Sequence, residues 1–184
     1  MKKYLLLFCL AGFAFGETSL DLDPAQTQIN FTLHDPLHTV HGNFKLKRGS
    51  LHFDQTTGKA GGEIVIDVVS GQSGNGSRDK RMQKDVLESQ KFPEAVFLPD
   101  SVKGRLEGEG ESTLDVHGVF KIHGADHELT LTFLMDALGG GHYQATSHFD
   151  IPYVAWGLKD PSNFLLKVDK TVQIEVKAAF VAHA

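Results

Sequence analysis

The feature that most constrains the fold of this chain is an alternation of apolar and other residues along most of its length. Between Leu114 and Ile122 every second residue is apolar or glycine, and the segments 129–135 and 172–180 repeat the pattern. Because successive side chains of a strand point to opposite faces, a period of two indicates strands with one buried face. Short turns with glycine, proline or aspartate separate these segments. The sequence therefore predicts an all-β fold, a sandwich or barrel of about eight antiparallel strands.

One stretch, residues 70–97, interrupts the alternation. A glycine-rich loop leads to Ser77, which is the predicted N-cap of a short helix over about 78–88. Met82 and Val86 lie one turn apart and give this helix an apolar face. A single amphipathic helix in a β protein must set that face against the rest of the fold. It is expected either to plug the end of the barrel or to cover a cavity there.

The first sixteen residues have the pattern of a secretory signal peptide. Two lysines precede an apolar run from Leu5 to Phe15, which ends in a small-x-small site at 14–16. The run is shorter than the ~20 residues that a membrane-spanning helix needs. We expect cleavage close to Glu17 and a single periplasmic or secreted domain over 17–184. Cys9 is the only cysteine, so the mature domain is expected to contain no disulfide.

Charge and composition narrow the range of functions. Without residues 1–16 the chain has 16 Lys and Arg against 23 Asp and Glu, a net charge of −7. An acidic chain of this kind is a poor ligand for nucleic acids and has no general attraction to anionic membranes. Thirteen phenylalanines against one tryptophan and three tyrosines supply large rings without a polar group. Such rings suit either a filled core or a dry cavity for a hydrocarbon, and the sequence leaves both open.

Two alternatives to a binding cavity follow from polar residues. The ten histidines raise the hypothesis of a metal-binding module, although their spacing matches no recognised zinc pattern. An enzyme ranks lower, because the chain has no nucleophile elbow, zinc-protease helix or Cys–His pair. The candidate metal ligands are His34, His38 and His41, or His117, His123 and His127, and the clustered carboxylates are Asp21 and Asp23, or Glu107, Glu109 and Glu111.

Four motifs, in order along the chain, resemble those of the YceI-like family. They are INFTLHDPLHTVHGNF (29–44), SRDKRMQKDVLESQKFPEAVF (77–97), VFKIHGADHELTLTF (119–133) and YVAWGL (153–158). The resemblance implies a lipocalin-like antiparallel β-barrel around an elongated apolar tunnel. It also implies export to the bacterial periplasm and binding of a long amphiphilic lipid, such as an isoprenoid quinone, a polyprenyl phosphate or a fatty-acid-like chain.

The leading hypothesis is therefore a non-catalytic lipid carrier with no cofactor and no metal. Its predicted partner is the lipid and not a nucleic acid, while transient membrane contact and a homodimer are left open. The lipid tail is expected to contact Phe31, Leu33, Val40, Phe44, Ile64, Ile66, Val68, Met82, Phe97, Phe120, Leu131, Phe133 and Trp156. The head group is expected near Asn75, Arg78, Asp79 and Arg81, of which Arg78 and Asp79 match the family pattern and Arg81 stands where many relatives have a histidine.

Overall fold

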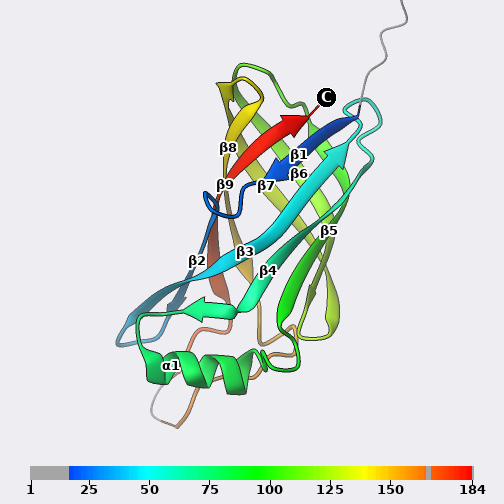
Figure 1. The fold of residues 1–184 in the computed structure, drawn as a ribbon. Coiled ribbons are helices and arrows are strands. Elements are labelled where there is room, and N and C mark those ends of the chain that lie inside the picture. The colour runs from blue at the N-terminus through cyan, green and yellow to red at the C-terminus, as the bar shows by residue number, and fades with distance from the viewer. Residues whose placement is uncertain (1–16, 165–166, 184) are drawn as a thin grey trace, which may run out of the picture.

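The structure is a computed structural model, which describes residues 17–164 and 167–183. The predicted signal peptide, residues 1–16, lies outside the described residues. One sheet contains every strand of the described chain (Figure 1). The strands are β1 (Thr18–Leu22), β2 (Gln28–His34), β3 (Thr39–Phe53), β4 (Ala60–Gln72), β5 (Glu94–Gly104), β6 (Gly110–Ile122), β7 (Ala125–Gly139), β8 (His142–Ile151) and β9 (Val172–His183).

The sheet closes on itself into an antiparallel barrel. The strand order is β1-β3-β2-β9-β8-β7-β6-β5-β4, and a further pairing between β3 and β4 completes the ring. This closure confirms the predicted barrel and removes the sandwich alternative. A closed barrel leaves no unpaired sheet edge.

Nine strands occupy eight positions in this ring, because β1 and β2 lie one after the other between β3 and β9. Leu20 of β1 pairs with Leu51 and Ala182, whereas Phe31 of β2 pairs with Gly42 and Ile174. The turn between β1 and β2 follows from its sequence. The Asp23 carboxylate accepts the Ala25 N–H at 2.8 Å, and Pro24 has no N–H to offer a neighbouring strand.

The core fills one end of the barrel. Alternation directs one face of every strand inward, and β1 and the C-terminus lie at the end of the barrel opposite the inserted helix (Figure 1). Several inward side chains of that half are almost fully buried. Leu20, Phe53, Leu114 and Met135 are among them, each at most 2 % exposed. These apolar side chains account for much of the stability of the barrel, since each fully buried one contributes about 1.5–3 kcal/mol.

The inserted helix lies across the opposite end of the barrel (Figure 1). It comprises α1 (Gly76–Arg81) and a π-helical turn η1 (Met82–Val86), close to the predicted 78–88. Its N-cap is Asn75 and not Ser77, because the Asn75 side chain accepts the Ser77 and Arg78 N–H groups. Just beyond the π-helical turn, Glu88 adopts a left-handed conformation (φ 44°) that prevents further helix. Among the described residues, no helix is both long and apolar enough to cross a bilayer.

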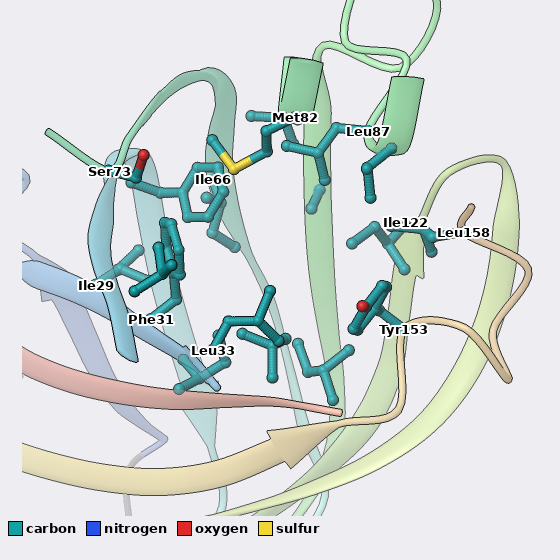
Figure 2. A pocket seen from close by; sticks show the side chains of 18 of the residues that line it. Ile29, Phe31, Leu33, Ile66, Ser73, Met82, Leu87, Ile122, Tyr153 and Leu158 are labelled. Carbon is teal, nitrogen blue, oxygen red and sulfur yellow. The ribbon is translucent and has the colours of Figure 1, made fainter. Parts of the chain in front are cut away.

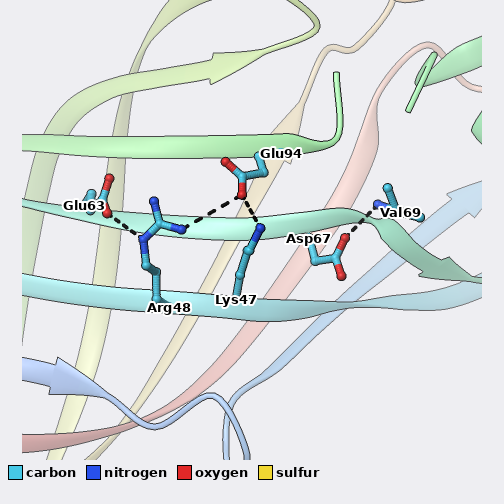
Figure 3. A network of polar contacts seen from close by, with 6 residues as sticks. All are labelled: Lys47, Arg48, Glu63, Asp67, Val69 and Glu94. Atoms are coloured by element: carbon cyan, nitrogen blue, oxygen red, sulfur yellow. Dashed lines mark hydrogen bonds and ion pairs between the residues drawn. The ribbon is translucent and has the colours of Figure 1, made fainter. Parts of the chain in front are cut away.

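Polar side chains join β3, β4 and β5 on the outside of the barrel (Figure 3). Arg48 donates to Glu63 at 2.7 Å, and both Arg48 and Lys47 pair with Glu94. The β3–β4 register shifts between Leu46 and Arg48. These side-chain contacts therefore link β3 to its neighbours at the point where its backbone pairing with β4 is irregular. Exposed ion pairs add little stability. Because these charged side chains point outward, the inward face of the same strands carries apolar side chains.

Candidate functional site

An internal cavity of about 720 Å³ occupies the half of the barrel nearest the helix. Its wall is mostly apolar, because the inward positions of the strands carry aliphatic and phenylalanine side chains. Ile29, Phe31 and Leu33 of β2 border it from one side, and Ile66 of β4 borders it as well (Figure 2). A volume of this size lies within the ~300–1,000 Å³ typical of sites for small organic ligands.

A glycine makes room for one ring in this wall. Gly42 pairs with Phe31 across β2 and β3, and a Cβ atom on Gly42 would lie 2.3 Å from Phe31 Cζ. A side chain at position 42 would clash with the Phe31 ring and also with the Gln72 carbonyl oxygen, which lies 2.3 Å from the same Cβ position. The valine-x-glycine-x-phenylalanine pattern of this segment therefore has a steric role.

The helix and the segment that joins β8 to β9 form the mouth of the cavity. Met82 and Leu87 project into the cavity from the helical segment, and Tyr153 and Leu158 border it from the β8–β9 connection (residues 152–164 and 167–171) (Figure 2). Tyr153 Oη donates to the Asp169 carbonyl at 2.7 Å, which ties the two ends of this connection together. The helix therefore covers a cavity, the second of the two arrangements that the sequence left open.

The far end of the cavity is closed. Leu20, Phe53, Leu114 and Met135 fill the other half of the barrel and do not border the cavity. The inner limit of the wall lies at residues such as Leu22, Leu46 and Phe133. Among the described residues, the cavity is thus a pocket with one mouth and one blind end.

The charged residues of the wall all lie at the mouth. They come from the β2–β3 turn, the helical segment and the β8–β9 connection, and none comes from the inner half of the described wall. The set comprises His34, Asp35, His38, Arg78, Arg81, Asp85, Lys159 and Asp160. An apolar interior with a charged rim is an arrangement that suits an amphiphile.

Acidic groups at the mouth have pKa values that favour the charged form. Main-chain N–H donation from Leu37 lowers the pKa of Asp35, and hydrogen bonds from Ser162 lower the pKa of Asp160. Burial raises the pKa of Tyr153 to about 12, and the Asp160 and Asp169 carboxylates add to this effect. At neutral pH the rim therefore contains fixed charges of both signs, and the Tyr153 phenol remains neutral.

The four predicted head-group residues divide into two pairs. Arg78 and Arg81 border the cavity mouth, whereas Asn75 and Asp79 lie outside its wall. Asn75 caps the helix. Asp79 accepts the Ser73 N–H at 2.8 Å and also the Ser73 hydroxyl. Contact of these four residues with a head group stays a prediction.

Arg78 also supports the loop that precedes the helix. Its Nη2 donates to the Ser73 carbonyl at 2.6 Å and its Nε to the Ser73 hydroxyl at 2.7 Å. Arg81 is exposed and has no side-chain hydrogen bond or ion pair among the described residues. Of the two arginines, Arg81 is therefore the one with its guanidinium available to a ligand.

The residues predicted to contact a lipid tail border the cavity, with the exception of Trp156. Trp156 packs instead on His127 and near Phe120. Alternation in β2 and β9 could have identified Ile29, Ile174 and Val176 as further wall residues. Tyr153 and Leu158 carry no such signal, because they lie in an irregular segment.

Histidines of the first predicted metal set are engaged in other contacts. His34 bonds the Thr39 hydroxyl and His41 the Thr32 hydroxyl, both at 3.0 Å. Within residues 17–164 and 167–183, one group of three side chains has metal-ligand spacing, and it matches neither predicted set. That group is Asp100, His117 and Glu128 on the outer face of β5, β6 and β7.

A closed antiparallel barrel with an apolar cavity under a short helix defines a lipocalin-like β-barrel protein. Within that class the chain belongs to the family of the YceI-like domain, whose model matches residues 20–180. The resemblance drawn from the four sequence motifs is thereby confirmed.

Relatives and solved structures agree with this assignment. A UPF0312 protein of Pseudomonas putida (strain W619) is 28% identical over 146 residues, which cover 74% of this chain and 72% of the relative. Burkholderia cenocepacia BcnA superposes with a TM-score of 0.69 at 17% identity, covering 86% of this chain and 99% of BcnA. A Saccharophagus degradans domain described as polyisoprenoid binding and implicated in plant cell wall breakdown gives a TM-score of 0.67 at 17% identity, covering 89% and 98%.

Proposed function

We propose that this protein is a non-catalytic carrier of one long-chain amphiphilic lipid, an isoprenoid or a fatty-acid-like chain. The tail lies in the barrel cavity and the polar end lies at the mouth. The observation that carries this proposal is the contrast between a cavity of about 720 Å³ with apolar walls and a rim that holds all of its charged residues. The name of the Saccharophagus degradans neighbour, a polyisoprenoid binding domain, supports an isoprenoid as the ligand.

Energetics favour a carrier that exchanges its ligand with membranes. Removing about 20 methylene-sized groups from water contributes on the order of 16 kcal/mol at ~0.8 kcal/mol each, and ordering the chain offsets part of this gain. Relative to a bilayer the gain is close to zero, since lipid tails are as apolar as the cavity wall. The protein would therefore take lipid from a membrane reversibly, and cavity shape and rim contacts would determine which lipid it prefers.

A periplasmic site of action is part of the proposal. The signal-peptide pattern of residues 1–16 supports it. A carrier of this kind would move lipid through an aqueous compartment, where a bare hydrocarbon tail is costly.

The acidic residues considered for catalysis support a carrier over an enzyme. Asp21 pairs with His183 at 3.2 Å, and Asp23 caps the turn between β1 and β2. Neither borders the cavity, and neither do Glu107, Glu109 and Glu111.

The direct test is analysis of the lipid that accompanies the purified protein. Mass spectrometry of an organic extract is expected to identify one lipid class in repeated preparations, and the stripped protein is expected to take up a fluorescent lipid. Ile66→Trp fills the cavity and should abolish uptake. Leu134→Trp, at a position 53 % exposed on β7, is the matched control and should bind as the wild type does. Wild-type protein that yields no lipid and takes up none would reject the carrier function.

A further inference from the structure

A hydroxyl group lies near the blind end of the cavity, in the inner part of the wall, which is otherwise apolar. Thr27 immediately precedes β2 and has the same parity as Ile29, Phe31 and Leu33, so it shares their inward face. It is 8 % exposed and borders the cavity. Its Oγ1 is buried and has no hydrogen-bond partner among the described residues.

A second buried hydroxyl lies nearby on the inner face of β8. Ser147 is 1 % exposed, and its Oγ likewise has no partner in the described chain. Ser147 pairs with Val176 of β9, and Val176 pairs in turn with Ile29, two residues from Thr27. Ser147 is therefore level with Ile29, two residues closer to the mouth than Thr27, and unlike Thr27 it does not border the cavity.

The orphaned Thr27 hydroxyl is unfavourable for a cavity that holds only hydrocarbon. A buried hydroxyl without a partner costs about 1–3 kcal/mol, and a valine side chain would avoid that cost. The hydroxyl offers one donor and two acceptor positions. The charged groups of the wall are all at the mouth, so the inner end suits a neutral oxygen and not a carboxylate or phosphate.

We propose that the Thr27 hydroxyl forms a hydrogen-bonding subsite that receives a neutral oxygen group, a hydroxyl or a carbonyl, on the end of the lipid that enters first. This inference rests on the proposed carrier function and specifies its substrate class. The preferred ligand is oxygenated at its buried end. A lipid with a charged head at the mouth and an oxygen at the tip of its tail satisfies both ends of the cavity.

A pair of ligands that differ only at the buried end tests the subsite. Hexadecanoic acid and 16-hydroxyhexadecanoic acid both present a carboxylate to the rim, and affinity is measured by displacement of a fluorescent lipid. The wild type is expected to bind the hydroxy acid at least as tightly as the plain acid. Thr27→Val should weaken the hydroxy acid by about threefold to tenfold, as expected for one net hydrogen bond, and leave hexadecanoic acid unchanged.

The control variant is Thr32→Val, because the Thr32 hydroxyl bonds His41 away from the cavity. It should leave both affinities unchanged. Ser147→Ala removes an orphaned hydroxyl outside the cavity wall and should also leave both affinities unchanged. The melting temperatures of Thr27→Val and Ser147→Ala without ligand should equal or exceed the wild-type value, since each variant removes an orphaned hydroxyl.

Two outcomes overturn the subsite: a wild type that prefers hexadecanoic acid by tenfold or more, or a Thr27→Val variant in which the affinities for both acids change equally or not at all. A wild type that binds neither acid nor the fluorescent lipid rejects the carrier function itself. 1-Hexadecanol, whose only oxygen is its head group, assigns the source of the oxygen. If Thr27→Val weakens 1-hexadecanol, the head group enters the cavity first. If Thr27→Val weakens only the hydroxy acid, the subsite binds the tip of the tail.

Discussion

The indole ring of Trp156 lies parallel to the imidazole ring of His127, with ring centroids 4.2 Å apart and 6° between the ring planes. Trp156 belongs to the β8–β9 connection and His127 to the start of β7. The stack therefore fastens part of the cavity mouth to the barrel wall. Because Trp156 is the only tryptophan of the chain, tryptophan fluorescence reports on the surroundings of this one ring.

Removal of the stacking partner should loosen the mouth. His127→Ala is expected to shift Trp156 emission to longer wavelength, because the indole becomes more exposed to water, and to accelerate lipid release several-fold. Fluorescence spectra and stopped-flow lipid transfer measure the two effects. His142→Ala, at the start of β8 and at the closed end of the barrel, should change neither. Unchanged emission in His127→Ala would contradict the role assigned to the stack.

Two adjacent residues on β7 should differ in how strongly a charged substitution destabilises the protein. Phe133→Asp puts an unpaired carboxylate at a position that is 5 % exposed and borders the cavity, so it is expected to prevent folding or to destabilise the protein by several kcal/mol. Leu134→Asp, at a position 53 % exposed, should cost less than about 1 kcal/mol. Urea denaturation of the pair measures the difference. Equal stability of the two variants would be incompatible with the inward direction of Phe133.

The two arginines at the mouth should have different roles. Arg81→Ala is expected to weaken an anionic lipid more than its neutral analogue and to leave the melting temperature unchanged, since the Arg81 side chain makes no polar contact within the described residues. Arg78→Ala should also weaken the anionic lipid more, but it should lower the melting temperature because it removes the two hydrogen bonds to Ser73. Calorimetry with matched anionic and neutral lipids separates these effects. Equal loss for both lipids in both variants would exclude a head-group role for either arginine.

Stability above pH 10 should depend on Tyr153. Burial raises its pKa from 10.0 to about 12 in the folded protein, so the neutral phenol favours folding. This contribution is complete below the unfolded-state pKa and is lost as the pH rises from about 10 toward 12. The free energy of unfolding of the wild type, minus that of Tyr153→Phe, should be constant below pH 10 and decrease above it. A difference independent of pH up to 12 would show that the phenol titrates normally.

The titration of His117 should reflect its two carboxylate neighbours. A hydrogen bond to Asp100 at 2.9 Å, with a further contribution from Glu128, raises the pKa of His117 above its usual 6.5. Its stabilising contribution is complete below pH 6.5 and is lost as the pH rises through the raised value. In an NMR titration, Asp100→Asn should lower the pKa of His117 more than Glu128→Gln does. The reverse order would mean that the Asp100 hydrogen bond is not the main cause.

The inward-facing residues could be predicted to a large extent, because side chains along a strand point alternately inward and outward. Phe31, Leu33 and Phe133 were assigned to a ligand-facing surface from alternation and border the cavity. Tyr153 and Leu158 could not be found in this way, since their segment has no period and its path is fixed by tertiary contacts such as the Tyr153–Asp169 hydrogen bond. Trp156 was assigned to the wall, but its position depends on the stack with His127, 29 residues away in the chain.

By itself, the sequence determined the alternating antiparallel strands and the one inserted helix, because parity and turn chemistry are local properties, and its four motifs indicated the barrel of the YceI-like family. Only the tertiary structure decided that one half of the interior is packed and the other half hollow. Whether inward side chains meet depends on their combined size across strands that are distant in the chain. Leu20, Phe53 and Met135 meet and fill one end, whereas Ile29, Phe31 and Ile66 leave a cavity beneath the helix.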